Sequence, residues 1–554
     1  MVMSLGKTPK TEDLFLSSRD VCEKWLSEDS IYRILHREGS RLFPDEGFAD
    51  LFAKRGRDSI PPQIVAVVMV LQRMEGLSDR EAVARCRFDL RWKYAAGGLD
   101  FDYSGFGHTV LVGMRARLRN SQAPNRIFEA VLNVAKKAGL VGRKRVLDST
   151  ALYDAVATQD TVTLIRSAIR GVLRVADAAL AAQLRAVLKR DDDYATTGKP
   201  VCDWEDKEAR EALVDALARD GYAVLSILDG RNLGPQQQQA AQLLAAVLGQ
   251  DLEDDDGRFR IARRVARDRI ISTVDPEARH GHKTSARSFD GYKGHIALDP
   301  DSEIITATEV TAANVGDAEP AESLLDDVLN KDEPNAPAVP SPQSVSKAGA
   351  QEAKSIDSSP AEVYGDASYG TADIVERLER AAIEPYVKVQ APSMRDGKFA
   401  QDKFQIDLAA GTVQCPAGQL AEIRQRKAGG AHATFGSQCE VCPLRDACTS
   451  SKNGRTINVH PKHETLHRIR QQQAEPRWKN KYRQTRPKVE RKLAHMMRRR
   501  HGGRRARVRG RSRLGHDFSL LAAAINLQRL VALGVAYFGR GWETSAVPSS
   551  ATSA

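Results

Sequence analysis

The sequence predicts an α/β protein with a mixed β-sheet that is preceded and interrupted by helical segments. Two short apolar segments, Val146–Leu147 and Glu362–Gly365, each run into an aspartate and lie next to helical patterns. Two longer segments, at 293–299 and 303–311, alternate with a period of two and are rich in Ile, Thr and Val. Strands with interposed helices form a mixed sheet, and its functional residues are expected where the strands end.

Helical patterns dominate the chain before the first strand. A helix is predicted to begin near Ser59 and to end at Gly76. Ser78 and Glu81 have the spacing of a capping box at the start of the next helix. Two further helical patterns follow, at 109–119 and 124–138. The spacing fits a DNA-reading domain of the helix-turn-helix kind, and it fits a plain helical bundle at least as well.

The remaining segments complete a predicted order of domains. They are a helical N-terminal domain at 1–140, a sheet domain at 141–159 and 271–390, a helical insertion at 160–270, a four-cysteine insertion at 391–455, a C-terminal part of the sheet domain at 456–540 and a disordered tail at 541–554. Residues 331–360, rich in Pro, Ser and Ala, are predicted to be a linker. An apolar helix is predicted at 516–538.

Positive charge is concentrated in one stretch, Lys479–Arg513. It contains 16 Lys or Arg and one acidic residue, Glu490, and so carries +15, while the whole chain carries +11. The rest of the chain is therefore slightly acidic. A basic stretch of this density is typical of a protein that binds a phosphate backbone, and Arg504 and Arg505 are predicted to contact DNA.

A carboxylate within such a stretch repels phosphate, so Glu490 needs a reason to be there. One interpretation is an ion pair on the helix surface with Arg486 or Arg491. The other is a metal ligand for cutting a phosphodiester, in which arginines hold the polyanion and the carboxylate helps to hold the activating cation. This stretch alone does not decide between them.

Two aspartates upstream favour the metal interpretation. Asp148 and Asp366 are 218 residues apart, and each follows a predicted strand and precedes small residues. Either one alone fits a common turn at the end of a strand. Together with Glu490 they offer three hard oxygen ligands of the kind that Mg²⁺, or Mn²⁺, prefers. Two cations bridged by such acids would hold the attacking and leaving oxygens of an in-line displacement.

Other candidate ligands and DNA contacts lie between these acids. His280 and His282 are potential metal ligands, but a basic turn is the favoured interpretation, with Lys283 and Lys293 near DNA phosphates. Three tyrosines are candidates for stacking on exposed bases or, alternatively, for core packing: Tyr292, Tyr364 and Tyr369.

Four of the seven cysteines have metal-like spacing. Cys415, Cys439, Cys442 and Cys448 follow the pattern C-P, C-x₂-C-P and C. Four thiolates in a tetrahedral array form a closed structural Zn²⁺ site, and redox or incidental cysteines are the alternative.

The composition excludes several other classes. Seven cysteines are too few for a disulfide scaffold in a chain of 554 residues, which favours a reducing, cytoplasmic setting. The first 15 residues have no long apolar run, so no signal peptide is expected. The apolar segment Phe518–Phe538 contains Asn526 and Arg529 and is expected to pack within the protein and not to span a membrane.

Successive blocks of the sequence resemble a known family. The blocks VLDSTAL, GYKGHIALD, ITATEVTAANVGD, VYGDASYG and YRQTRPKVERKLAHM resemble those of bacterial insertion-sequence transposases of the DDE superfamily. The early block FAKRGRDSIPPQIVAVVMVLQRMEGLSDREAVARCRFDLRW is similar to the N-terminal domain that accompanies many of them. The resemblance keeps the order of the blocks over most of residues 40–535.

The resemblance implies an RNase H-like catalytic domain in which Asp148, Asp366 and Glu490 are the metal-binding triad. It also implies that Tyr482, Arg486 and Glu490 form the Tyr–Arg–Glu signature of the family, and Tyr482, Arg486 and Arg498 are expected to contact DNA. Three residues separate Tyr482 from Arg486 where two are usual, and Met497, beside Arg498, stands where a basic residue is expected.

The implied function is transposition. The chain is expected to bind double-stranded DNA, both at the terminal inverted repeats of its element and at the target, and to cut and join it with Mg²⁺. Pairing two ends favours a homodimer on DNA, and the expected place is the bacterial nucleoid, with no membrane partner. Two alternatives remain open at this point: a transposase-derived DNA-binding protein with structural acids, and a nuclease that cuts without joining.

Overall fold

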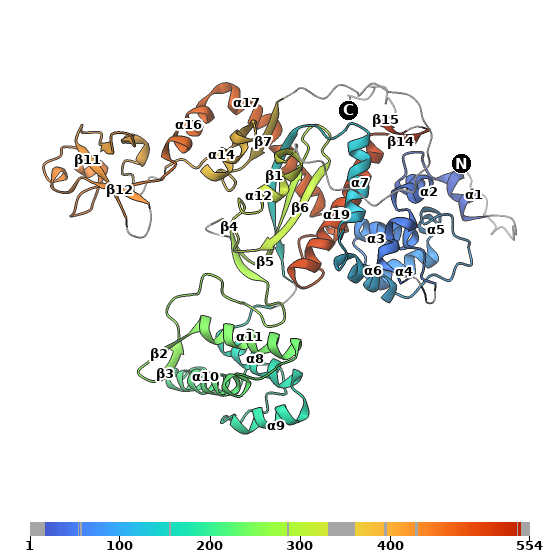
Figure 1. Cartoon of the computed structure of the whole chain (residues 1–554), viewed down its shortest axis with the longest axis horizontal. Helices are drawn as coiled ribbons and strands as arrows, with labels where there is room; N and C mark the ends of the chain where they lie inside the picture. The colour runs from blue at the N-terminus through green and yellow to red at the C-terminus, as the bar shows by residue number, and fades with distance from the viewer. Residues whose placement is uncertain are drawn as a thin grey trace, which may run out of the picture.

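The structure is a computed structural model that describes residues 17–53, 55, 58–154, 157–284, 287–330, 360–392, 396–426, 430–539 and 541–544. A central β-sheet lies between helices, the N-terminal helices pack beside it, and two lobes project from it (Figure 1). The predicted mixed α/β class is confirmed. The predicted linker and tail lie outside the described residues, apart from residue 360 and residues 541–544.

The central sheet is mixed. Its strands are β1 (Lys144–Tyr153), β4 (Arg279–Thr284), β5 (Arg287–Leu298), β6 (Ile305–Ala312), β7 (Ala361–Gly365) and β8 (Ile383–Val387). β1 is antiparallel to β5 on one side and parallel to β7 on the other, and β8 continues the parallel half. The far edge of β5 pairs with β4 along its first half and with β6 along its second half. The path from β6 through β5, β1 and β7 to β8 therefore changes from antiparallel to parallel at β1.

The prediction that the first strand ends at Asp148 is wrong. β1 continues to Tyr153 because the residues after Asp148 pair with β5. On its other edge β1 pairs with β7 only from Lys144 to Val146. The last residues paired in this ladder are Val146 and Tyr364. Two residues further along each strand, Asp148 lies level with Asp366, the residue that follows β7. The two aspartates thus lie side by side where the ladder between their strands has ended.

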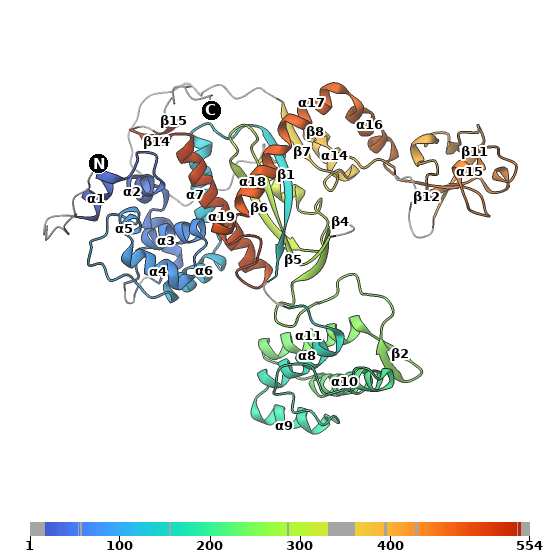
Figure 2. The same cartoon turned by 180° about the vertical axis from the view of Figure 1, so that it is seen from behind.

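Side chains of β1 alternate between two helical layers. Val146 and Leu152 belong to the core shared with the first layer, whereas Leu147 belongs to the core of the second. The first layer contains α17 (Pro476–Thr485), α18 (Pro487–Met496) and α19 (Arg511–Ala532), which lie over one face of the sheet (Figure 2). The second contains α12 (Ala321–Leu324), α13 (Asp326–Leu329), α14 (Ala372–Arg380) and α16 (His463–Ala474).

The last predicted helix is shifted. α19 ends at Ala532 and not at 538, because Gly534 adopts a left-handed conformation with φ 66° that stops the helix. Two short strands follow and pair with each other, β14 (Val535–Phe538) and β15 (Gly541–Thr544). No helix in the described ranges is both long enough and apolar enough to cross a membrane.

All but the first of the N-terminal helices share one continuous core with the sheet. The N-terminal helices are α1 (Ser18–Trp25), α2 (Ile31–Leu42), α3 (Pro62–Glu75), α4 (Asp79–Phe88), α5 (Leu90–Ala95), α6 (Thr109–Arg119) and α7 (Arg126–Lys137). α3 is buried along its length and contacts α19. It begins at Pro62, three residues after the predicted cap, and ends at Gly76 as predicted. The predicted capping box of Ser78 and Glu81 is present.

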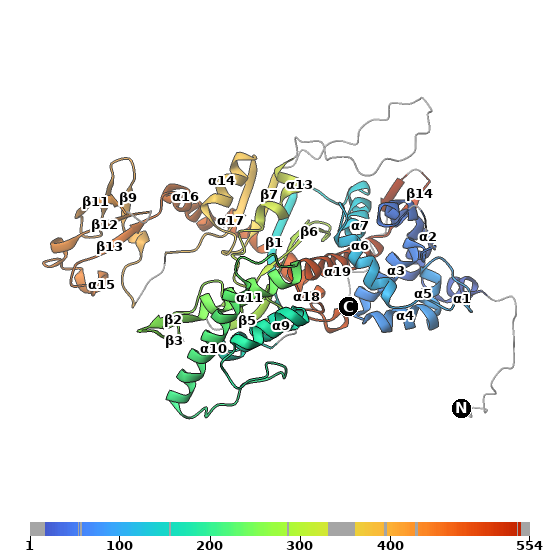
Figure 3. The same ribbon diagram turned by 60° about the horizontal axis from the view of Figure 1, so that its bottom comes forward.

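The helical insertion between β1 and β4 forms a lobe with its own core. It contains α8 (Thr161–Val175), α9 (Ala178–Val187), α10 (Lys207–Leu228), α11 (Pro235–Asp251), β2 (Leu252–Asp255) and β3 (Arg258–Ile261). Its helices lie beyond the end of the sheet formed by β4 and β5 (Figures 1 and 3).

The cysteine-containing segment forms the second lobe. Its elements are β9 (Gln405–Asp407), β10 (Thr412–Gln414), β11 (Leu420–Gln425), β12 (Ala431–Thr434), α15 (Arg445–Cys448) and β13 (Thr456–Val459). The strands form an antiparallel sheet around a small core of its own. This lobe separates β8 from α16 in the chain and lies far from the N-terminal helices (Figure 1).

A buried amide joins α19 to the sheet. The Asn526 side chain accepts a hydrogen bond from Ile305 N and donates one to Ile305 O, both at 2.8 Å. Asn526→Leu should lower the free energy of unfolding by about 1–3 kcal/mol for each backbone group left unpaired. Asn480→Leu, the same change at an exposed helical site, should cost less than about 0.5 kcal/mol. Equal losses for both variants in urea unfolding would contradict this assignment.

Candidate active site

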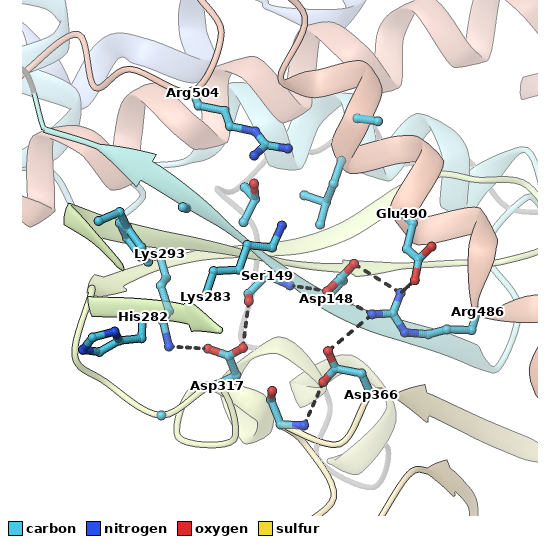
Figure 4. Close-up of a pocket in the computed structure, with 17 residues that line it drawn as sticks. Asp148, Ser149, His282, Lys283, Lys293, Asp317, Asp366, Arg486, Glu490 and Arg504 are labelled. Atoms are coloured by element: carbon cyan, nitrogen blue, oxygen red, sulfur yellow. Dashed lines mark hydrogen bonds and ion pairs between the residues drawn. The ribbon is translucent and has the colours of Figure 1, made fainter. Parts of the chain in front are cut away.

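Three carboxylates converge on one guanidinium group, that of Arg486 (Figure 4). Its Nη2 atom is 3.0 Å from Asp148 Oδ1 and 3.7 Å from Asp366 Oδ2, and its Nη1 atom is 3.5 Å from Glu490 Oε1. Nη1 also donates to Asp148 Oδ2 at 3.2 Å, so the contact with Asp148 is two-pronged. The structure therefore brings the three predicted acids together from β1, from the residue after β7 and from α18.

Arg486 lies at the junction of two helices and has helical backbone angles, φ −57° and ψ −39°. α17 ends where α18 begins, and Pro487 is the first residue of α18, where a missing N–H is tolerated. Glu490 lies one turn beyond Arg486 in the first turn of α18, where the helix dipole favours an acid. The alternative interpretation of Glu490 as an ion-pair partner of Arg486 therefore holds as geometry. Arg491 pairs instead with Glu303, at 3.1 Å.

The cluster is buried on one side and open on the other. The side chains of Arg486 and Asp148 are 7% and 13% exposed, whereas those of Asp366 and Glu490 are 41% and 63% exposed. Burial raises the pKa of the Asp148 carboxyl, although the charge of Arg486 acts against this rise. Burial alone would lower the pKa of Arg486, but the charge of Asp148 holds it above its ordinary value. Three ionised acids and one guanidinium sum to −2, the charge that one divalent cation neutralises.

A cavity of about 610 Å³ opens in front of the cluster. Its lining includes the three acids, Arg486, and the basic side chains of Lys283, Lys293 and Arg504. Lys293 and His282 lie on one flank, Glu490 and Arg486 lie on the other, and Arg504 lies across the opening (Figure 4). An acidic floor with a basic rim is an arrangement that suits a phosphodiester held beside a bound cation.

Asp317 is a fourth acid of this cavity and was not among the residues predicted from the sequence. Its carboxylate accepts from Ser149 Oγ at 2.8 Å and pairs with Lys293 Nζ at 2.7 Å. β6 ends at Ala312 and Asp317 follows within the block ITATEVTAANVGD, whereas Asp366 comes directly after β7. An acid shortly after a strand was a signal available in the sequence. Lys293, a predicted DNA contact, is therefore ion-paired with Asp317 in this structure.

The other predicted DNA contacts differ in exposure. Lys283, Arg498, Arg504 and Arg505 are exposed, and of these Lys283 and Arg504 line the cavity. Tyr482 is 8% exposed, stacks on Trp478, and its hydroxyl donates to Gly365 O at 3.3 Å. Its contacts therefore support the backbone beside Asp366. The three tyrosines considered for base stacking are buried and hence unavailable to a base: Tyr292, Tyr364 and Tyr369.

The basic stretch is not a uniform DNA-binding surface. Arg486 faces the acids, and Lys492 is buried with its Nζ 3.6 Å from Glu303. Arg507 donates to Leu77 O at the end of the N-terminal helix α3, and burial lowers its pKa. Part of the positive charge predicted to bind phosphate therefore holds the fold together. Arg504 lies in a segment that pairs with Tyr153 at the end of β1, which directs it toward the cavity.

The four cysteines line a common cavity of about 20 Å³ in their lobe. Cys415, Cys439, Cys442 and Cys448 are all free thiols, and burial raises the pKa of Cys448. Across the ranges that the structure describes, no three His, Cys, Asp or Glu side chains are gathered closely enough to hold a metal ion in this conformation. At the acidic cluster the reason is plain, because Arg486 lies between the carboxylates.

Two family models match the chain. Residues 20–117 match a model described as "Transposase domain (DUF772)", and residues 414–531 match one described as "Transposase DDE domain". The second match includes the four cysteines, Arg486 and Glu490. No curated protein and no solved structure matches the chain. Together the two matches indicate an insertion-sequence transposase of the DDE family.

The guanidinium of Arg486 is expected to stabilise the buried carboxylate of Asp148, and removing it tests this. Arg486→Met leaves a buried carboxylate without its partner and should lower the free energy of unfolding by about 3–5 kcal/mol at neutral pH. The loss should shrink as the pH falls through the raised pKa of Asp148, because protonation removes the unpaired charge. Denaturant unfolding at several pH values measures both effects.

Arg491→Met is the matched control, since Arg491 is 62% exposed and pairs with Glu303. It should cost less than about 1 kcal/mol. If the loss of unfolding free energy in Arg486→Met does not change with pH, or equals the loss in the control, Arg486 does not stabilise the charged form of Asp148.

Proposed function

We propose that this transposase cuts and joins DNA at the cluster of Asp148, Asp366 and Glu490 with the help of a divalent cation. The observation that carries the proposal is the convergence of these acids on one guanidinium from three distant parts of the chain. A structural role for any one acid does not account for three within 4 Å of the same group at the floor of a basic-rimmed cavity.

The order of strands supports an RNase H-like catalytic domain. The sheet runs β6, β5, β1, β7 and β8, with an antiparallel half and a parallel half that meet at β1. Asp148 on β1 and Asp366 after β7 flank the point where the two halves meet, and α18 brings Glu490 over the same face. In this proposal the two lobes are insertions into that domain.

The donor set fits Mg²⁺ or Mn²⁺, because all three groups are carboxylates and the site carries −2 with Arg486 in place. Asp148, Asp366 and Glu490 would hold the cation, which supplies activation of the attacking oxygen and charge neutralisation. Arg486 keeps the acids together in the metal-free state. Lys283 and Arg504 at the rim would hold the phosphate backbone of the DNA.

The substrate and assembly complete the proposal. The N-terminal helices would bind the terminal inverted repeats, and the cavity would receive first an element end and then the target DNA. Two chains would act together as a homodimer, one on each end. The place of action would be the bacterial nucleoid in the cytoplasm, because the DNA substrate is there.

The cysteine lobe is proposed to hold one structural Zn²⁺. Its four thiols line one cavity of about 20 Å³, and thiolates select Zn²⁺ over Mg²⁺. The thiols would have to move closer together to bind the metal, because no three of them lie within metal-binding reach in this conformation. The lobe has a small core of its own, so a metal would add to its stability.

Asp148→Asn, Asp366→Asn and Glu490→Gln should each abolish Mg²⁺-dependent cleavage and joining of element ends. A neutral amide oxygen binds Mg²⁺ far less well and leaves the charge of the cation uncompensated. Binding of DNA should persist, because each change removes a negative charge that faces phosphate. The losses should not add in double variants, because the three residues act as one unit.

Glu303→Gln is the control, since Glu303 pairs with α18 from outside the cavity. It should retain cleavage and joining. Strand transfer by Glu490→Gln at the wild-type rate would leave that residue an ion-pair partner only. Cleavage without joining in the wild-type protein would favour the nuclease alternative, and DNA binding with neither would favour the DNA-binding alternative.

The purified chain should contain about one Zn²⁺, and Cys442→Ser should lose it and destabilise the cysteine lobe. Cys202→Ser, in the helical insertion, should retain the metal. Metal analysis by mass spectrometry together with limited proteolysis measures both outcomes. A folded wild-type preparation without zinc would refute the site.

A further inference from the structure

A second cavity continues the catalytic cavity toward the helical insertion. It measures about 830 Å³ and lies between the strands β4 and β5 and the segment 261–271, which leads out of the insertion. His282, Lys293 and Gly316 line both cavities, so the two form one groove that runs from the acidic cluster to the insertion. Figure 4 shows His282 and Lys293 at one flank of the first cavity.

Most charged groups of this second cavity are already paired. Arg269 pairs with Asp251 at 2.6 Å, Arg279 with Asp268 at 2.8 Å, and Lys293 with Asp317 at 2.7 Å. Asp290 accepts from Thr158 and contacts His280. These pairs account for every acid that lines the cavity.

Two arginines of the cavity are unpaired. Arg264 and Arg267 line it and are exposed, and neither guanidinium makes a hydrogen bond or an ion pair with another described residue. They are the cations of this cavity that remain available to a ligand. A groove with two unpaired arginines that opens into an acidic, cation-binding floor suits an extended polyanion.

The segment that carries these arginines is fixed to the rest of the molecule. Ile270 exchanges two hydrogen bonds with the Gln250 side chain, at 2.7 and 3.0 Å. Thr273 N donates to Gln159 Oε1 at 2.8 Å, and Arg269 is anchored on Asp251. Arg264 and Arg267 are therefore held at the mouth of the groove by a short, anchored segment.

We propose that the helical insertion provides the second wall of the DNA groove, and that Arg264 and Arg267 bind the phosphate backbone beside the scissile position. The proposal rests on the proposed function, because it assigns DNA as the polyanion. It gives the insertion a role in substrate binding, separate from the N-terminal helices and from the basic stretch around α18. Cleavage and joining of the DNA remain assigned to the acidic cluster.

The test compares salt dependence of DNA binding in EDTA, where no cleavage occurs. Arg264→Gln/Arg267→Gln should reduce the slope of log K against log salt for a random-sequence duplex by about 1.8, since each phosphate contact contributes about 0.9. Arg264→Lys/Arg267→Lys should keep the wild-type slope, because counterion release needs only the charge. A single strand of the same sequence, measured in parallel, tells whether the groove holds one strand or two.

Arg263→Gln/Lys207→Gln is the matched control. It removes two charges from the same lobe, but these side chains are 90% and 81% exposed and do not line the groove. Its slope should equal that of the wild type. An unchanged slope in the groove variant, or an equal fall in the control, would overturn the proposal.

The outcomes separate this proposal from the proposed function. A wild-type chain that cleaves element ends while the groove variant keeps its slope refutes the groove alone. If the groove variant shows the predicted lower slope but the wild-type chain never cleaves element ends, the catalytic proposal is refuted and the groove proposal stands. Thermal unfolding of the groove variant should match the wild type, because both arginines are exposed and unpaired.

Discussion

The contact of Arg486 with three carboxylates is the interaction on which the candidate active site depends. Asp148 is a largely buried acid in the middle of β1, and burial of an unpaired charge is strongly unfavourable. The guanidinium offsets that unfavourable free energy by pairing with Asp148. It also contacts Asp366 and Glu490. In the proposed function, the cation would bind at this same position. Metal binding would then exchange the positive charge of Arg486 for that of the metal.

The surrounding fold explains why these groups meet. The ladder between β1 and β7 stops before Asp148, so the two strands leave their aspartates side by side at an open edge. Arg486, at the junction of α17 and α18, and Glu490, in the first turn of α18, lie at this edge. The core that holds α18 and α19 against the sheet also includes the N-terminal helices α2 to α7. The N-terminal helices and the sheet that carries the acids are therefore joined by one hydrophobic core.

Local signals predicted much of this fold. The capping box at Ser78, the stop at Gly76 and the alternating pattern of β5 and β6 depend on neighbours in the chain, and the structure has them. The length of β1 depends on pairing with β5, about 140 residues away, and was underestimated. Tyr482 and Arg507 carry groups typical of DNA contacts, but tertiary packing uses them inside the protein. Asp317 was missed because its partners, Ser149 and Lys293, are distant in the sequence.

The most direct test of the central claim is a crystal structure of the chain soaked with Mn²⁺, with the metal located by its anomalous signal. The account predicts Mn²⁺ coordinated by Asp148, Asp366 and Glu490, with the guanidinium of Arg486 moved away from the acids. Mn²⁺ bound elsewhere, with Arg486 still between the three carboxylates at saturating metal, would contradict it.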